Sequence, residues 1–117
     1  MLADQDCIFC NIALGEAPAQ KVYQDEWVTA FRDIHPLAPV HILIIPNKHL
    51  TNTNDLSPEH AAMAARMLTV VPELAKQEGI ADSGYRLIMN AGPNGNQVVM
   101  HMHMHLLGGS RMQHPMG

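Results

Sequence analysis

Residues 101–107 have the sequence His-Met-His-Met-His-Leu-Leu, in which histidine alternates with apolar residues. In an extended strand, alternate side chains share one face and lie about 6.7 Å apart. A strand over this stretch therefore carries three histidines on one face and Met102, Met104 and Leu106 on the other. The apolar face is typical of a core, but strand propensity gives no reason to choose histidine over valine, threonine or tyrosine. The alternation predicts a core strand, and its histidine face calls for a functional explanation.

The remaining pattern predicts an α+β fold, an antiparallel β-sheet with one long helix and a short N-terminal helix. Ser57-Pro58 is typical of a helix start and Gly79 of a helix end, with His60 expected to be solvated in the first turn. Pro72 lies inside this helix and is expected to kink or divide it. The other expected segments are a short helix over 7–15 and strands over 21–23, 27–31, 40–45, 85–89 and 98–107.

Length and charge limit the classes of function. The chain of 117 residues is long enough for one domain and too short for two, so residues 1–117 are expected to form a single domain. Hydrophobic residues make up 47% of the chain and charged residues 15%, which is typical of a globular protein. The net charge of −4 argues against a nucleic-acid partner. Without an apolar stretch long enough for a bilayer or an opening signal peptide, we expect a cytoplasmic protein with no membrane partner.

Cys7 and Cys10 are the two cysteines of the chain, spaced C-x-x-C. In a reducing compartment a structural disulfide is not expected. Two cysteines supply half of a tetrahedral zinc site, and the same spacing also occurs in redox motifs. From the residues alone, a redox pair, half of a metal site and two thiols without a function remain open.

The histidine face allows two kinds of chemistry. Three histidines could bind zinc, although neighbours two residues apart suit two ligands better than three. Alternatively, a neutral imidazole is a good nucleophile near pH 7, and neighbouring protonated imidazoles can hold phosphate oxygens. The turn over 90–96, rich in glycine and asparagine, could offer backbone N–H groups to an anion, and Asp33 could bind ribose hydroxyls. A solvated loop aspartate is the competing interpretation of Asp33.

Residues 101–107 also resemble the signature of the histidine triad family, His-φ-His-φ-His-φ-φ with φ apolar, without a gap. The resemblance covers nearly the whole chain, and its other blocks are Asp33–His41, Ile44–His49, Tyr85–Asn90 with Gln97, and Leu106–Gly109. In length and motif order the chain looks most like the small nucleoside-phosphoramidase branch. The family fold is an antiparallel sheet with helices, paired across a two-fold axis, so the resemblance implies a homodimer.

The resemblance implies a purine nucleotide-binding hydrolase that cleaves nucleoside 5′-phosphoramidates at the α-phosphate. His103 would attack phosphorus and form a nucleotidyl-histidine, which water would hydrolyse to release the nucleoside monophosphate. His105 would hold phosphate oxygens, and His41 would complete a quartet of histidines. Two alternatives stay open: a dinucleoside polyphosphate hydrolase or nucleotidyl transferase, and a nucleotide-binding regulatory module with little catalysis.

The resemblance also implies a set of substrate contacts. They are Ile8, Phe9 and Ile34 around the base, Asp33 on the ribose hydroxyls, and Asn90, Gln97, the backbone at Val98, His103 and His105 at the phosphate. Three positions depart from the family pattern: Val98 stands where serine or glutamate is common, His35 where serine is common, and Asn96 where glycine is common. These departures bear on the choice of leaving group more than on the basic chemistry.

In the wider superfamily, which includes galactose-phosphate uridylyltransferases, a C-x-x-C pair and two histidines hold structural zinc. The matching residues here are Cys7, Cys10, His49 and His101. Two thiolates and two imidazoles make a closed tetrahedral set, so the expected zinc is structural. No organic cofactor is expected.

Overall fold

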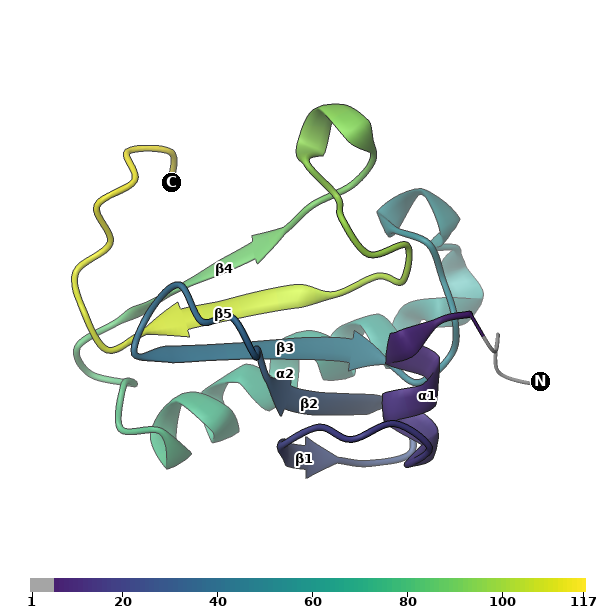
Figure 1. The fold of residues 1–117 in the computed structure, drawn as a ribbon, viewed down its shortest axis with the longest axis horizontal. Coiled ribbons are helices and arrows are strands. Elements are labelled where there is room, and N and C mark those ends of the chain that lie inside the picture. Colours follow the sequence, from purple (N-terminus) through teal and green to yellow (C-terminus); the bar gives the residue numbers. More distant parts are fainter. Residues whose placement is uncertain (1–5) are drawn as a thin grey trace.

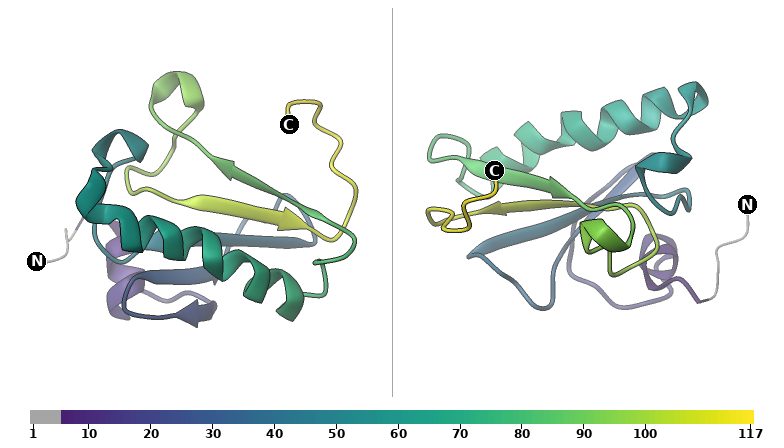
Figure 2. Two further views of the ribbon diagram at one scale, coloured as in Figure 1. Left: turned by 180° about the vertical axis from the view of Figure 1, so that it is seen from behind. Right: turned by 90° about the horizontal axis from the view of Figure 1, so that it is seen from above.

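Five strands form one antiparallel sheet in the order β1-β2-β3-β5-β4, and a helix lies on each face (Figures 1 and 2). The computed structural model describes residues 6–117. The strands are β1 (Lys21–Gln24), β2 (Val28–Arg32), β3 (Val40–Pro46), β4 (Tyr85–Met89) and β5 (Met104–Gly108). The helices are α1 (Ile8–Leu14) and α2 (Ala61–Gln77), with 3-10 turns η1 (Thr53–Asp55), η2 (Pro58–His60) and η3 (Pro93–Gly95). The α+β prediction is confirmed, whereas the single domain over 1–117 stays a prediction and includes residues outside the described part.

β3 lies at the centre of the sheet and is buried on both faces. Ile42 and Ile44 pack with α2 in the larger core, whereas Leu43 and Ile45 pack with α1 on the opposite face. Figure 2 shows α2 and α1 on the two sides of the sheet. A strand covered on both faces has a continuous apolar run rather than an alternating one, which explains the sequence of residues 40–45. Each fully buried side chain of this size stabilises the fold by about 1.5–3 kcal/mol.

β5 is shorter than predicted, because residues 98–103 are irregular. Its pairing with β3 begins at Met104, and two residues beyond that point β3 ends at Pro46. Proline has no N–H to donate to the ladder, so the pairing does not continue. The Pro46 carbonyl instead accepts a hydrogen bond from the His101 ring, with Nε2 and oxygen 2.9 Å apart. The prediction of a strand over 98–107 is therefore wrong over residues 98–103.

The two faces predicted for the histidine segment are nevertheless present. Met102, Met104 and Leu106 lie in the core beneath α2 and are at most 4% exposed. His101 and His103 lie on the opposite side, where their rings meet a phenylalanine of α1. The alternation of side chains therefore extends beyond the strand, and it separates an ordinary core from a face that carries reactive groups.

α1 begins and ends where the sequence predicts. The Cys7 sulfur accepts a hydrogen bond from the Cys10 amide at 3.2 Å, which caps the first turn. Gly15 ends the helix with φ at +78°, in the left-handed region that favours glycine. Both cysteines are thereby held at the N-terminal end of a helix that packs against the sheet.

The start of the long helix differs from the prediction, because Pro58–His60 form the 3-10 turn η2 ahead of α2. His60 is buried rather than solvated, since its Nδ1 accepts from the Ser57 amide at 3.1 Å and so caps this end. The expected division at Pro72 is wrong, because α2 runs through it without a break. Pro72 lies on the exposed side of the helix while Val71 beside it is buried, so packing against the sheet holds this turn in place.

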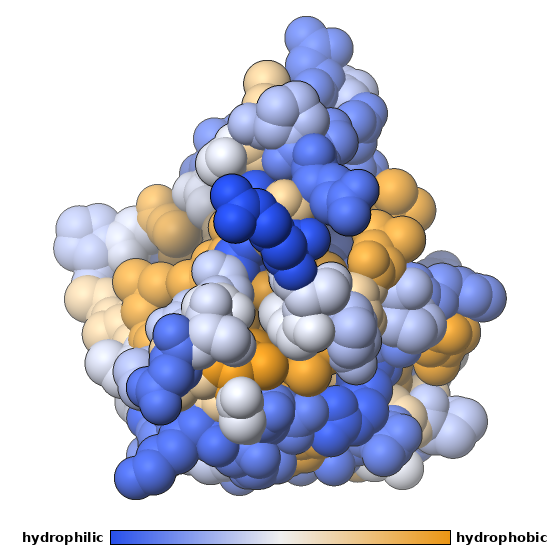
Figure 3. Space-filling model, turned by 90° about the vertical axis from the view of Figure 1, so that its left-hand side faces the viewer, coloured by the Kyte–Doolittle hydropathy of each residue, from blue (hydrophilic) through white to orange (hydrophobic). Residues whose placement is uncertain are grey.

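Several apolar side chains remain exposed on loops. Figure 3 shows the face on which the β2–β3 loop and the C-terminal tail lie, with apolar surface between hydrophilic residues. The β2–β3 loop contributes Ile34 and Leu37, and Val98 is exposed on the loop before β5. Within residues 6–117, no helix is both long enough and apolar enough to cross a membrane. Because the exposed side chains lie in loops near the predicted site residues, they are candidates for contact with a ligand.

Candidate active site and metal centre

Two groups of side chains adjoin on the α1 side of the sheet. The first, which we term the metal cluster, consists of Cys7, Cys10, His49 and His101. The second, which we term the histidine site, consists of Asp33, His41, His103 and His105. The two groups meet because His101 and His103 belong to one short segment.

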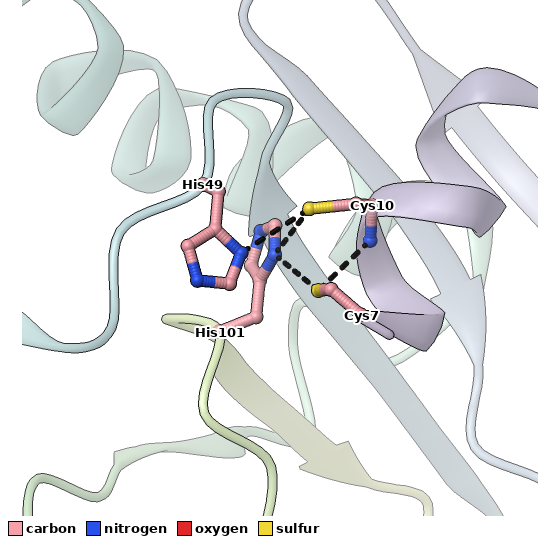
Figure 4. Close-up of side chains that lie close together, drawn as sticks. All are labelled: Cys7, Cys10, His49 and His101. Atoms are coloured by element: carbon pink, nitrogen blue, oxygen red, sulfur yellow. Dashed lines mark hydrogen bonds between the residues drawn. The ribbon is translucent and has the colours of Figure 1, made fainter. Parts of the chain in front are cut away.

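Figure 4 shows the four side chains of the metal cluster pointing toward one another from α1, the loop after β3 and the segment before β5. Cys7 Sγ lies 3.2 Å from His101 Nδ1, and Cys10 Sγ lies 3.2 Å from His49 Nδ1. All four ligand atoms lie within 4.8 Å of one another. In a tetrahedral zinc site, neighbouring sulfur and nitrogen ligands are about 3.6 Å apart. The cluster therefore has a donor set and a spacing that suit a zinc ion.

Hydrogen bonding decides which nitrogen of His101 faces the sulfurs. Its Nε2 lies 2.9 Å from the Pro46 carbonyl, which can only accept, so Nε2 carries the proton. Nδ1 then carries the lone pair that faces Cys7 and Cys10. Burial lowers the pKa of His101 to about 4, so this ring is neutral at neutral pH. A neutral imidazole is the form of histidine that binds a metal ion.

A separate chain of hydrogen bonds orders the histidine site. The Leu37 amide donates to His41 Nδ1 at 3.1 Å, so His41 carries its proton on Nε2. That Nε2 donates to His105 Nδ1 at 2.9 Å, which leaves the proton of His105 on its own Nε2. His105 therefore presents an N–H donor on the side of its ring away from His41.

Burial keeps both of these imidazoles neutral. Burial and, to a lesser extent, the neighbouring His103 and His41 lower the pKa of His105 to about 4. Burial also lowers the pKa of His41, although the carboxylate of Asp33, with Oδ2 3.5 Å from His41 Nε2, opposes this shift. The hydrogen bonds described above require His41 and His105 to be neutral, because a neutral ring has one N–H and one lone pair.

In His103 the proton lies on the other ring nitrogen than in His41 and His105. Its Nδ1 lies 2.7 Å from the His101 carbonyl, which can only accept, so Nδ1 carries the proton and Nε2 the lone pair. His103 is buried, and its ring centroid lies 5.3 Å from that of Phe9 and 5.1 Å from that of His105. A nucleophilic lone pair thus lies beside an N–H donor. This arrangement suits attack at phosphorus while a phosphate oxygen is held.

Two amide side chains shape the loop that precedes the histidines. Gln97 is buried and uses both ends of its amide: Oε1 accepts from the Gly92 amide at 2.9 Å, and Nε2 donates to the Thr51 carbonyl at 2.6 Å. Asn90 Nδ2 donates to the Gly95 carbonyl at 2.6 Å. Asn90 and Gln97 therefore brace this loop, and their contact with phosphate, implied by the resemblance, stays a prediction.

The residues predicted to contact base and ribose differ in exposure. Ile8 on α1 is 49% exposed and Ile34 is 83% exposed, so both can meet a ligand. Phe9 is only 7% exposed and packs against histidine rings. Asp33 lies in the histidine site, where its Oδ1 accepts from the His35 amide at 2.8 Å. Ile8 and Ile34 are thus open to a ligand and Asp33 is partly exposed, whereas Phe9 is buried.

The structure shows the local environment of two of the residues that depart from the family pattern. Val98 is 86% exposed, so its side chain is open to a ligand or to solvent. Asn96 has φ at +60°, in the left-handed region, which asparagine adopts more readily than most residues other than glycine. The change from glycine to asparagine at this position therefore preserves the turn.

Three backbone groups that decide the chemistry were not predicted from the sequence. They are the Leu37 amide, the Pro46 carbonyl and the His101 carbonyl, which set the tautomers of His41, His101 and His103. Every residue supplies a carbonyl, and nearly every residue an amide, so no residue type could have marked these positions. The proline that ends β3 is the one partial signal, because it points to a carbonyl left outside the ladder.

Comparison with known proteins identifies the family. The profile of the HIT domain family matches residues 14–112, a range that holds every histidine of both groups but neither cysteine. A purine nucleoside phosphoramidase of Escherichia coli strain K12 is 56% identical over 105 residues, which cover 90% of this chain and 88% of that protein. A 14 kDa zinc-binding protein of Zea mays is 48% identical over an alignment of 118 positions, which covers 99% of this chain and 91% of that protein.

The fold agrees with this assignment. The crystal structure of a HIT family hydrolase from Legionella pneumophila Philadelphia 1 matches with a TM-score of 0.91 at 46% identity, covering 96% of this chain and all of that one. The likeness in sequence and structure extends across the sheet and the histidine segment that the site is built on. The chain belongs to the histidine triad, or HIT domain, family.

Proposed function

We propose that this chain hydrolyses purine nucleoside 5′-phosphoramidates, with His103 as the nucleophile. The observation that carries the proposal is the 2.7 Å hydrogen bond from His103 Nδ1 to the His101 carbonyl, which places the lone pair of the neutral ring on Nε2. The likeness to a protein named purine nucleoside phosphoramidase supports the substrate class. A nucleotidyl transferase or a dinucleoside polyphosphate hydrolase would use the same nucleophile, and product analysis on a mixed panel of substrates separates these activities.

The proposed reaction has two steps. First, the lone pair of His103 Nε2 attacks the α-phosphorus, the P–N bond breaks, and the amine leaves with a proton from a neighbouring acid or water. The Nε2–H of His105 donates to a phosphate oxygen and offsets the charge that develops in the transition state. Water then attacks the nucleotidyl-histidine, which releases the nucleoside monophosphate and restores His103. His41 acts through His105, because its hydrogen bond keeps the proton of His105 on Nε2.

The exposed residues around the histidine site support a nucleotide as the substrate. Asp33 lies close to His41, so a ribose bound by this carboxylate would lie near a phosphate held by His105. Ile8 and Ile34 offer exposed apolar surface to a purine base. At Val98 the backbone would contact the phosphate, while the side chain offers the leaving group an apolar contact and no hydrogen bond.

We further propose that the metal cluster binds structural zinc. Two thiols and two imidazoles at distances close to those of a tetrahedral site support this ion. The likeness to a protein named as zinc-binding is a second support. Thiolate ligands persist in a reducing compartment, which agrees with the cytoplasmic location expected from the sequence.

A homodimer formed through the open edge of the sheet is also proposed. β4 is the last strand in the order, and its Tyr85 and Leu87 are 39% and 38% exposed. Two such edges related by a two-fold axis would extend the antiparallel sheet and cover these side chains. Leu87→Lys should therefore shift the protein toward monomer in sedimentation velocity at micromolar concentration. A wild-type protein that sediments as a monomer would contradict the proposed dimer.

Replacement of His103 tests the proposed nucleophile. His103→Ala should lower kcat/KM for adenosine 5′-phosphoramidate by roughly 10³-fold or more, because the covalent step has lost its attacking atom. Intact-mass analysis during turnover should find a nucleotidyl adduct on the wild-type protein and none on the variant. His114→Gln, which alters an exposed histidine of the C-terminal tail, should stay within about twofold of wild type. Full activity of His103→Ala would rule out the mechanism.

Elemental analysis tests the zinc proposal. Protein purified without chelator should hold about one zinc ion per chain. His49→Gln removes one of the four ligands, so both the zinc content and the melting temperature should fall. His35→Gln, at an exposed histidine outside the cluster, should change neither quantity. Wild-type protein with far less than one zinc ion per chain would contradict the proposal.

The lowered pKa of His105 predicts how stability depends on pH. His105 has a pKa of about 4 in the folded chain and an ordinary value of 6.5, so the unfolded chain binds more protons between these values. The stability contributed by neutral His105 is fully present above pH 6.5 and is lost as the pH falls toward 4. In urea unfolding of zinc-saturated protein, His105→Gln should reduce the slope of unfolding free energy against pH by up to about 1.4 kcal/mol per pH unit. Equal slopes for variant and wild type would contradict a buried, neutral His105.

A further inference from the structure

α1 places an aromatic ring between the metal cluster and the proposed nucleophile. Phe9 stands between Cys7 and Cys10 in the sequence and lies in the first turn of the helix. Its ring meets that of His103 edge-on, with centroids 5.3 Å apart and planes at 82°, and meets that of His101 at 5.9 Å. A movement of this turn would therefore displace the side chain that packs against His103.

His101 forms a second connection between the same two groups. Its Nδ1 faces Cys7 Sγ at 3.2 Å, and its Nε2 donates to the Pro46 carbonyl at 2.9 Å. Its own carbonyl accepts from His103 Nδ1 at 2.7 Å. His101 thus belongs to the metal cluster through its side chain, while its backbone carbonyl determines which ring nitrogen of His103 carries the proton.

We propose that Phe9 is a positioning residue for His103, and that an ion in the metal cluster holds Phe9 and the His101 carbonyl so that His103 keeps its Nδ1–H tautomer. The kinetic test of this inference rests on the proposed function. Thiols form only weak hydrogen bonds, so without an ion the cluster connects its four side chains loosely. α1 has seven residues, too few for a stable helix by itself, and it depends on its anchors for a fixed position.

The burial of Phe9 favours a role in positioning His103 over direct contact with a purine base. Phe9 is 7% exposed, whereas its neighbour Ile8 is 49% exposed. A residue that binds the base affects substrate and transition state alike and changes KM, whereas a residue that orients the nucleophile changes kcat. The two roles of Phe9 therefore predict different kinetic results.

Phe31 supplies a matched control. Its ring lies 5.4 Å from that of Phe9, and both belong to the apolar cluster beneath α1, but Phe9 is the one of the two that meets His103. In zinc-loaded protein, Phe9→Leu should lower kcat on adenosine 5′-phosphoramidate about 10- to 100-fold, with KM within about twofold. Phe31→Leu should leave kcat within about twofold at the same zinc content. A rise in KM at unchanged kcat for Phe9→Leu, or an equal loss of kcat in both variants, would overturn the proposal.

Nitrogen NMR of the histidine side chains tests the inference without substrate. The signals of His103 are assigned by their loss in His103→Gln. Zinc-loaded wild type should show the Nδ1–H tautomer, whereas wild type treated with EDTA and zinc-loaded Phe9→Leu should both show a mixture of tautomers. Because Phe9→Leu leaves all four side chains of the metal cluster unchanged, its spectrum is recorded with zinc present and does not depend on the stability of chelated protein.

Two results keep this inference apart from the proposed function. Identical His103 signals in zinc-loaded wild type, chelated wild type and zinc-loaded Phe9→Leu would overturn the positioning role whatever the enzyme cleaves. A wild-type protein that does not cleave the phosphoramidate would contradict the proposed function alone, and the spectra would still decide the role of Phe9.

Discussion

The hydrogen bond from His103 Nδ1 to the His101 carbonyl is the constraint on which the histidine site depends. It can form because β5 begins only at Met104, so the His101 carbonyl takes no part in a strand ladder. The early end of that ladder follows from Pro46, which has no N–H to donate and whose own carbonyl accepts from the His101 ring. One proline at the end of β3 therefore shapes both the metal cluster and the nucleophile.

The alternation in residues 101–107 is sufficient to predict which side chains face the site, but not how the backbone runs there. Met104 and Leu106 lie in the core as predicted, because side chains alternate in any extended segment. The limit of the strand could not be predicted from its own residues, since the proline that stops the pairing lies on β3. The roles of the carbonyls could not be predicted either, because a backbone group has no residue type to mark it.

The metal cluster and the loop that holds Gln97 also depend on contacts that a local sequence pattern does not predict. The C-x-x-C pair supplies half of a ligand set, and only the family resemblance indicated His49 and His101, which are 39 and 91 residues away from Cys10. Gln97 braces its loop through Thr51, 46 residues earlier. A local pattern identifies residues suited to such contacts, whereas the fold decides which of them meet.

The imidazoles of His41, His103 and His105 can share this small region because each ring nitrogen that meets a neighbouring group has a fixed role as donor or acceptor. The Leu37 amide donates to His41 Nδ1, and His41 Nε2 donates to His105 Nδ1, so both histidines carry their protons on Nε2. The His101 carbonyl accepts from His103, which is therefore left with a lone pair on Nε2. A second proton on His105 would set two donors against each other across the 2.9 Å contact with His41, and burial opposes that charge as well. At neutral pH the backbone, rather than an acidic side chain, thus decides which histidine donates and which attacks.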